Sequence, residues 1–379
     1  MEMNMERYTR QVILKGFGQE SQQKLREASV LVIGAGGLGC PSLLYLAAAG
    51  VGQIGLIDGD VVCLSNLHRQ VLFSTDDIGT LKVEAAAKKL IELNPEISIT
   101  PYPFFISYSN ILDIIKAYDF VIDGTDNFEA RYLINDACVM LDKPLIFAAV
   151  SGYEGQLAVF NIADVNGIKT NYRDIFPVSP EKGEILNCAE NGVIGVLPGV
   201  IGTMQAAETI KLITGTGKPL VNKILNYNLL LQSFYEIELT TAPVGSYRIP
   251  ESESEFISQG LGYPMDKNPD FRLEVDINEL KDLQAKDPTI LIDVREAREA
   301  PKLNAEICKQ FPLSNFQALL NQDIAEKNII LFCQHGIRSL SAVEIIREKY
   351  GLSKNIYSLK GGISRRENYL NLNYDRKEN

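Results

Sequence analysis

The chain of 379 residues has no tryptophan, only two histidines and no C-x-x-C pair among its six cysteines. With only two histidines, neither a Ser-His-Asp triad nor a histidine-rich metal centre is expected. No apolar run is long enough to cross a bilayer, and the polar N-terminus lacks the apolar segment of a signal peptide. Scattered cysteines without a secretion signal predict a cytoplasmic protein with free thiols.

Positive charge is also in short supply, with 37 lysines and arginines against 48 acidic residues and a net charge of -11. Nucleic-acid-binding surfaces are usually basic, so nucleic acid and membrane surfaces are not expected as partners. A hydrophobic fraction of 46% and a charged fraction of 22% are typical of globular proteins. The length allows two or three domains.

A glycine-rich loop follows the first expected strand. Residues 29–33 lead into Gly34-Ala35-Gly36-Gly37-Leu38-Gly39, and the next strand, residues 54–57, ends at Asp58. This order of strand, glycine turn, helix, strand and acid is typical of a βαβ nucleotide-binding unit. Asp58 stands at about the spacing of a ribose-binding carboxylate. Taken alone, the loop fits a dinucleotide-dependent dehydrogenase equally well.

Helices and strands continue to alternate after this unit, which predicts a mostly parallel α/β sheet covered on both faces. The expected helices are residues 40–49, 83–93 and 131–141, and the expected strands are residues 120–122 and 145–150.

Charged and polar residues flank the glycine loop in a pattern that favours a nucleoside triphosphate. They are Arg10, Asp60, Ser65, Asn66, Arg69, Lys82 and Asp126. Cations stabilise a departing pyrophosphate and a carboxylate can hold Mg²⁺. Hydride transfer needs no such cluster, so the pattern predicts ATP and Mg²⁺ rather than a nicotinamide.

The second half of the chain predicts a smaller α/β domain. Residues 246–270 are rich in acidic, small and proline residues and are expected to form a linker. The expected organisation is residues 1–245, the linker, and residues 271–379. In the last part we expect strands at 290–292, 329–332 and 356–359, and a helix at 340–349.

A cysteine loop, Cys333-Gln334-His335-Gly336-Ile337-Arg338-Ser339, joins a strand to a helix in this domain. Loop amides, the helix N-terminus and the charge of Arg338 are expected to stabilise an anionic sulfur at Cys333. A phosphatase loop is the competing interpretation, but it has five residues between cysteine and arginine. The four residues here predict a smaller cradle, suited to a persulfide.

The N-terminal motifs resemble the MoeB/ThiF/HesA family, bacterial relatives of the ubiquitin-activating enzymes. The matching segments are residues 7–11, 34–39, 64–70, 124–127, 188–190 and 195–199. The resemblance implies a Rossmann-like homodimer that adenylates the C-terminal Gly-Gly carboxylate of a ubiquitin-like sulfur carrier.

The resemblance also implies roles for individual residues. Gly34, Gly36, Gly37 and Gly39 form the nucleotide loop. Asp58 is similar to the ribose ligand, Asp126 to the Mg²⁺ ligand, and Ser65, Asn66, Arg69 and Lys82 to phosphate-site residues. Arg10 is similar to the arginine that relatives extend across the dimer to the partner's ATP. Cys188 is similar to a loop cysteine proposed to form a covalent intermediate, the alternative being an unreactive small residue.

Family members commonly bind structural Zn²⁺ through two C-x-x-C pairs, and this chain departs from that pattern. The pairs would fall on residues 171–174 and 242–245, which contain no cysteine. We therefore expect no zinc, with packing in its place.

The C-terminal segment resembles the rhodanese domain. Residues 291–296 and 359–363 resemble its entry and exit motifs, whereas residues 303–312 lack its usual turn. Together the two resemblances imply an adenylyltransferase fused to a sulfurtransferase in molybdopterin or thiamine biosynthesis. Cys333 would carry a persulfide supplied by a donor such as a cysteine desulfurase. Two alternatives remain: an enzyme that adenylates another peptide or protein, with a rhodanese-like docking module, and a non-catalytic adenylate-binding protein.

Overall fold

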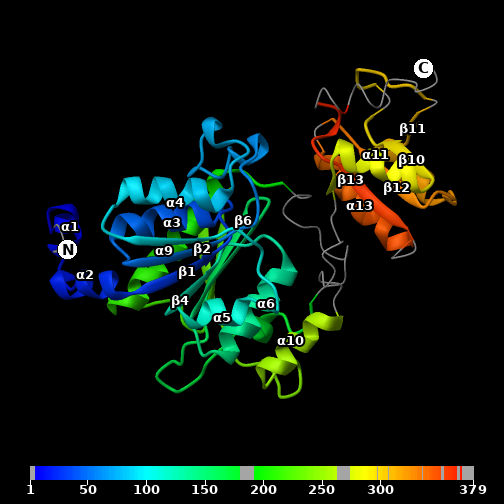
Figure 1. The fold of residues 1–379 in the computed structure, drawn as a ribbon. Coiled ribbons are helices and arrows are strands. Elements are labelled where there is room, and N and C mark those ends of the chain that lie inside the picture. The colour runs from blue at the N-terminus through cyan, green and yellow to red at the C-terminus, as the bar shows by residue number, and fades with distance from the viewer. Residues whose placement is uncertain are drawn as a thin grey trace. The chain divides into compact units, whose positions relative to one another are not determined.

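The computed structural model describes residues 5–179, 192–262 and 274–368, apart from 297, 306, 335, 351–353 and 365–367. Two compact units divide the chain, Met1–Met265 and Asp266–Asn379, and each is described by itself. Figure 1 shows a sheet flanked by helices in both units.

The first unit is built on an eight-stranded sheet. Its strands are β1 Ser29–Ile33, β2 Gln53–Ile57, β3 Ser98–Tyr102, β4 Phe120–Asp123, β5 Leu145–Ser151, β6 Glu154–Phe160, β7 Lys223–Asn228 and β8 Ser233–Glu238. They lie in the order β3-β2-β1-β4-β5-β6-β7-β8. Strands β3 to β5 in this order are parallel, and β6, β7 and β8 are antiparallel additions. The mostly parallel sheet predicted from the alternating pattern is confirmed.

Helices cover both faces of this sheet (Figure 1). The apolar residues of α3 Gly39–Ala49, α4 Lys82–Leu93 and α9 Val196–Thr214 pack in one core, and those of α5 Ile111–Lys116 and α6 Phe128–Met140 pack in another. The remaining elements before residue 180 are α1 Met5–Val12, α2 Gly18–Glu27, α7 Tyr172–Ile175 and the 3-10 turns η1 Leu64–Asn66 and η2 Thr75–Asp77. Because β1 is buried along its whole length, its run of β-branched and aliphatic residues suits a central strand.

The stretch expected to be a linker contains a packed helix. Helix α10 spans Glu253–Gly262, and its Phe256 is fully buried in the core that contains α5 and α6. The Phe256 ring lies 5.0 Å from the ring of Tyr108. Charged and small residues surround Phe256 in the sequence, so composition alone pointed to a linker. The buried Phe256 ring and the ion pair between Lys116 and Glu253 both hold the helix on the first unit.

The second unit has a five-stranded parallel sheet in the order β11-β10-β12-β13-β9. Its strands are β9 Glu274–Val275, β10 Thr289–Asp293, β11 Lys309–Gln310, β12 Asn328–Phe332 and β13 Asn355–Leu359. Its helices are α11 Ile277–Lys286, α12 Gln317–Leu320 and α13 Ile337–Tyr350, with 3-10 turns η3 Leu313–Asn315 and η5 Gly362–Ser364. Apolar residues fill a core on each face of this sheet. The predicted smaller α/β domain is confirmed.

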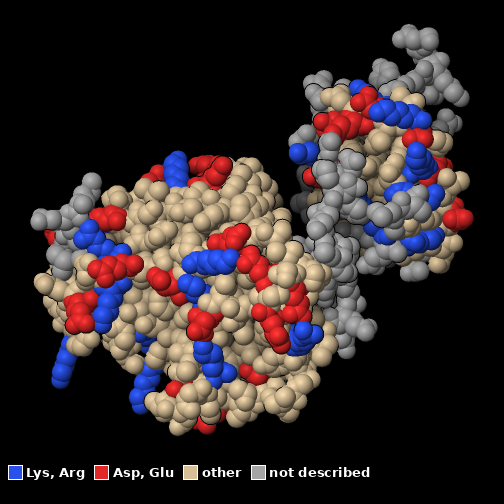
Figure 2. All heavy atoms as spheres, turned by 60° about the horizontal axis from the view of Figure 1, so that its bottom comes forward, with Lys and Arg blue, Asp and Glu red and all other residues tan. Residues whose placement is uncertain are grey.

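Within the described residues, no helix combines the length and apolar character needed to cross a bilayer. On the face that Figure 2 shows, acidic and basic side chains are interspersed over the surface. A basic patch of the kind that binds nucleic acid is not present on that face.

Candidate nucleotide pocket and cysteine loop

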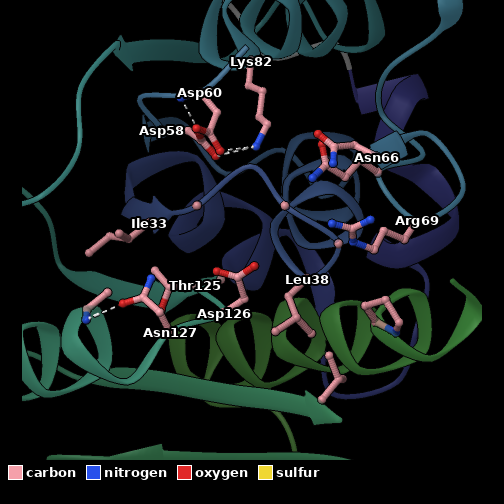
Figure 3. Close-up of a pocket in the computed structure, with 18 of the residues that line it drawn as sticks. Ile33, Leu38, Asp58, Asp60, Asn66, Arg69, Lys82, Thr125, Asp126 and Asn127 are labelled. Atoms are coloured by element: carbon pink, nitrogen blue, oxygen red, sulfur yellow. Dashed lines mark hydrogen bonds and ion pairs between the residues drawn. The ribbon is translucent and has the colours of Figure 1, made fainter. Parts of the chain in front are cut away.

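A pocket of about 630 Å³ opens at the carboxyl ends of β1, β2 and β4. The strand order reverses beside β1, between β2 and β4, and ligands of open α/β sheets bind at such switch points. The pocket wall includes all but one of the predicted nucleotide-binding residues: Gly34, Gly36, Gly37, Asp58, Asp60, Ser65, Asn66, Arg69, Lys82 and Asp126. Figure 3 shows the labelled side chains converging on one space.

Two glycines of the loop are required by close backbone contacts. Gly34 has a φ of +98°, and a Cβ there would meet the carbonyl oxygen of Gly124 at 2.8 Å. A Cβ on Gly39 would stand 1.9 Å from the carbonyl oxygen of Gly34. Gly39 is the predicted loop residue that does not line the pocket, and it instead lets α3 begin directly against the loop. The loop therefore brings backbone amides and the helix N-terminus to the pocket, an arrangement suited to phosphate.

Asp58, Asp60 and Lys82 form a charged cluster on one side of the pocket (Figure 3). Asp58 accepts hydrogen bonds from the amides of Ala35 and Asp60, each at 2.8 Å. Lys82 lies 2.8 Å from Asp60 and 3.7 Å from Asp58. Burial raises the pKa of Asp58, and the nearby Lys82 opposes this. Burial acts to lower the pKa of Lys82, but the attraction of Asp58 and Asp60 outweighs it and the net pKa is raised. Lys82 is therefore a cation held beside a buried carboxylate.

Arg69 and Asn66 lie to the right of Lys82 in Figure 3, on a neighbouring side of the pocket. The guanidinium of Arg69 contacts the carbonyl oxygen of Ser65 at 3.3 Å and His68 Nε2 at 2.9 Å. A Cβ at Gly37 would lie 3.1 Å from Pro198, so the loop approaches the start of α9 closely. Arg69 is therefore a second cation, besides Lys82, in the wall of the pocket.

The turn after β4 contributes further residues to the pocket region. The sequence motif at residues 124–127 includes some of them, but it predicted a role only for Asp126. Asp123 is buried, which raises its pKa, and it accepts hydrogen bonds from the Thr125 amide at 2.9 Å and hydroxyl at 2.6 Å. Asn127 caps α6 by accepting from the Ala130 amide at 2.8 Å. This capped turn presents the exposed Asp126 to the pocket.

Phe104 and Phe105 line the pocket, although sequence reasoning did not single them out. A Cβ at Gly59 would meet the Phe105 ring at 2.7 Å, so the ring lies directly on the turn after Asp58. The pair follows β3 and is exposed. The signal available in the sequence was two adjacent aromatic residues beyond a strand end, where parallel sheets place ligand contacts.

Arg10 is not among the described residues that line this pocket. Arg10 is an exposed residue of α1 and does not line the cavity of its own chain. Cys188 falls outside the described residues.

The two segments at which relatives carry zinc ligands are joined by hydrogen bonds centred on Asp174. One oxygen of Asp174 accepts from the Ala242 amide at 2.7 Å and the Tyr247 hydroxyl at 2.9 Å. The other accepts from the Asn171 amide at 2.8 Å, and Asn171 Nδ2 donates to Tyr247 at 2.7 Å. The expectation that packing alone would hold these segments therefore needs correction, because a carboxylate bridges them. In the described part of the chain, no group of three or more metal-ligating side chains occurs.

Purified protein is expected to contain no stoichiometric zinc, and chelators are expected to leave its melting temperature unchanged. Asp174→Ala should lower the free energy of unfolding by about 2 kcal/mol, because several donors lose their acceptor. Elemental analysis and thermal unfolding measure both, with the exposed Asp76→Ala as a control expected to unfold like the unaltered protein. One tightly bound zinc per chain would contradict the prediction.

In the second unit, Cys333 lies at the end of β12 in a loop closed by glycines. The side chain is 1% exposed, and its Sγ accepts the Gly336 amide at 3.1 Å. A Cβ on Gly362 would lie 2.2 Å from the Cys333 carbonyl oxygen. The Ile363 amide donates to that oxygen at 3.0 Å. The exit glycines are therefore needed to pack against the cysteine loop.

Arg338 lies near this thiol but is paired with a carboxylate that sequence reasoning missed. Its guanidinium donates two hydrogen bonds to Glu299, at 2.6 and 2.7 Å. This pairing holds the pKa of Glu299 at about 2 and raises that of Arg338. Arg338 was expected to stabilise an anionic sulfur with its positive charge. The ion pair with Glu299 fixes the orientation of Arg338 and offsets part of that charge.

Comparison with known proteins separates the chain into the same two parts. A profile of the ThiF family matches residues 8–245, and a profile of the rhodanese-like domain matches residues 276–367. The chain is 47% identical over 240 residues to "Sulfur carrier protein adenylyltransferase" of Thermus thermophilus, covering 63% of this chain and 89% of that protein. It is 38% identical over 365 residues to "Probable adenylyltransferase/sulfurtransferase MoeZ" of Mycobacterium tuberculosis, covering 94% of this chain and 91% of that protein.

Among solved structures, E. coli MccB with MccA-N7isoASN superposes with a TM-score of 0.56 at 25% identity, covering 66% of this chain and 76% of that one. The resemblances stated from the sequence motifs are confirmed. The chain belongs to the ThiF family and carries a rhodanese-like domain after its ThiF domain.

Proposed function

We propose that this protein adenylates the C-terminal glycine of a ubiquitin-like sulfur carrier with ATP and then converts the carboxylate to a thiocarboxylate. The observation that carries the proposal is the joining of two sites in one chain. One is a pocket of about 630 Å³ whose wall contains Lys82 and Arg69, and the other is a cysteine loop that offers a backbone amide to sulfur. The named relatives support the same pair of activities.

In the first step the carrier carboxylate attacks the α-phosphorus of ATP, and pyrophosphate leaves. The glycine loop and the N-terminus of α3 bind phosphate oxygens, and Asp58 holds the ribose. Lys82 and Arg69, which both line the pocket, stabilise the charge that moves onto pyrophosphate. The protein's contribution is positioning and charge stabilisation, so these cations matter more than any general base.

Asp126 is the residue proposed to hold Mg²⁺ within this pocket. Its carboxylate is exposed to the cavity rather than buried with a cation, which fits a hard cation that prefers oxygen ligands. When bound, Mg²⁺ would neutralise phosphate charge.

In the second step a persulfide on Cys333 attacks the acyl carbon of the carrier adenylate. The bond from that carbon to the phosphate oxygen breaks, and AMP leaves. A second thiolate then attacks the Cys333 sulfur and forms a disulfide with it, the bond between Cys333 and the carrier-bound sulfur breaks, and the carrier leaves as a thiocarboxylate. A thiol reductant then reduces the disulfide before the next turnover. Cys188 is the proposed second thiol. The sulfur donor is a persulfide-bearing protein such as a cysteine desulfurase.

The proposal includes a cytoplasmic homodimer acting in molybdopterin or thiamine biosynthesis, with adenylation in the first unit and sulfur transfer in the second. The dimer is proposed because Arg10 lies outside the pocket of its own chain and would complete the pocket of the partner.

A second candidate function is adenylation of a different peptide or protein, with the rhodanese-like domain as a docking module. The structural likeness to E. coli MccB favours this candidate, because that structure contains MccB together with MccA-N7isoASN. The pocket geometry serves both candidates, so the substrate decides between them.

The dependence of ATP–pyrophosphate exchange on the added substrate distinguishes the two candidates. Adenylation by this protein should depend on a small carrier that ends in Gly-Gly, measured as ATP–pyrophosphate exchange. The matched control is the same carrier lacking its last glycine, which should support no exchange. Exchange supported only by an unrelated peptide would favour the second candidate.

Arg10→Ala is expected to reduce exchange by about 100-fold, because one cation is removed from the phosphate site. Lys82→Ala in the same pocket should be similarly inactive. When the two variants are mixed, random exchange of subunits gives about a quarter of sites with both residues intact. Pyrophosphate exchange should recover accordingly. Failure to recover, with mixed dimers confirmed by mass, would show that Arg10 acts within its own chain.

A further inference from the structure

Two buried serine hydroxyls lie beneath the sulfur of Cys333. Ser339 is on α13 and Ser358 is on β13, and both are fully buried (Figure 1 shows these elements). Their Oγ atoms are 2.8 Å apart. Ser339 Oγ is also 2.9 Å from the Gly336 carbonyl oxygen and 3.6 Å from Cys333 Sγ. Ser358 Oγ lies 3.4 Å from the same carbonyl oxygen. The neighbouring strand β12 pairs Leu331 with Ser358, which fixes the serine just below the loop.

The number of hydroxyl protons limits which acceptors, the Gly336 carbonyl oxygen or the Cys333 sulfur, can receive a hydrogen bond at one time. Each hydroxyl has one proton, and the Gly336 carbonyl oxygen can only accept. When Cys333 is a neutral thiol, Ser339 can donate to Gly336 and accept from Ser358. When Cys333 is a thiolate, the sulfur becomes a stronger acceptor and draws the Ser339 proton. The carbonyl oxygen then needs another donor, and Ser358 is within reach of it.

We propose that Ser358 is a positioning residue that allows Ser339 to turn its hydroxyl from Gly336 to the Cys333 thiolate. The two hydroxyls rotate together as the thiol loses its proton to solvent, so neither buried acceptor is left without a donor. The Gly336 amide donates to the sulfur in both states. Without Ser358, the single proton of Ser339 must serve either the carbonyl or the sulfur. The inference rests on the proposed function only in that the thiolate is the form that accepts sulfur.

The test is the pH dependence of Cys333 alkylation by iodoacetamide in the full chain, followed by peptide mass spectrometry to isolate this thiol. In Ser358→Ala the pH at half-maximal rate should rise by about one unit, so alkylation below that pH slows about tenfold. Ser358→Thr restores a hydroxyl and should return the midpoint. The matched control is Thr289→Val. It removes a hydroxyl that is hydrogen-bonded to Asp287 and Asn328 at the start of β10, away from the cysteine loop. That variant should leave the midpoint unchanged.

A double-substitution cycle separates this role from a structural one. Ser339→Ala should raise the midpoint, and adding Ser358→Ala to it should raise it no further, because the second serine acts only through the first. Additive shifts, or an unchanged midpoint in a folded Ser358→Ala variant, would overturn the inference. The assay needs neither ATP nor a carrier, so its outcome is independent of the proposed function. A shifted midpoint in Ser358→Ala, together with an unaltered protein that transfers no sulfur to any carrier, would instead contradict the proposed function alone.

Discussion

Asp126→Ala is expected to reduce carrier-dependent ATP–pyrophosphate exchange by about 100-fold or more while leaving the fold intact. The side chain is exposed at the pocket and follows a turn whose geometry is set by Asp123 and Thr125. Removing it therefore deletes a charge at the phosphate site without removing a contact from the core. Exchange of labelled pyrophosphate into ATP measures the loss.

Two further variants show whether the loss of pyrophosphate exchange is caused by removing the negative charge at position 126. Asp126→Asn keeps the size of the side chain and should be similarly impaired. Asp113→Ala, an exposed carboxylate on α5 outside the pocket, should exchange normally. Normal exchange in folded Asp126→Ala would mean that another carboxylate performs this role.

Cys333→Ser is expected to reduce sulfur transfer to background while adenylation continues at its normal rate. A thiolate is the nucleophile, and a serine hydroxyl is far too weakly acidic to replace it at neutral pH. The two sites lie in separate compact units, so a change in one loop leaves the other pocket unaltered. Thiosulfate-to-cyanide transfer and carrier thiocarboxylate report the first activity, and pyrophosphate exchange reports the second.

Cys308→Ser is a matched control for this substitution. Cys308 is also a buried cysteine of the second unit, and burial raises the pKa of its thiol to about 11, so it is poorly suited to act as a thiolate. Both activities should persist in that variant. If Cys333→Ser retained both sulfur readouts, the C-terminal unit would be a docking module.

Sequence patterns predicted the central strands β1, β2, β4 and β5 of the first sheet, three strands of the second sheet and most of the nucleotide pocket. They did not predict β3, β6, β7, β8, β9 or β11. Buried strands such as β1 are continuous apolar runs, and the glycine loop follows one of them directly. Parallel strands bring their carboxyl ends to the same edge, so residues as distant as Asp58 and Asp126 were predictably neighbours. Those placements follow from local patterns combined with topology.

Other features depend on contacts that no local pattern specifies. Phe256 is the buried residue of a segment whose composition indicates a linker. Asp174 reaches segments far along the chain, and Glu299 pairs with Arg338 across the second unit. Ser358 gains its significance only because β13 places it under the cysteine loop. Each is an ordinary residue in the sequence, and tertiary packing alone gives it a specific partner.

The most direct test of the proposed adenylation and sulfur transfer is the mass of the sulfur carrier after incubation with this protein, ATP, Mg²⁺ and a persulfide donor. We expect the carrier to gain the mass difference between sulfur and oxygen at its C-terminal carboxylate. That gain should require both Asp126 and Cys333, whereas pyrophosphate exchange should require Asp126 alone. A carrier that is adenylated by the intact protein but never gains sulfur would contradict the central claim.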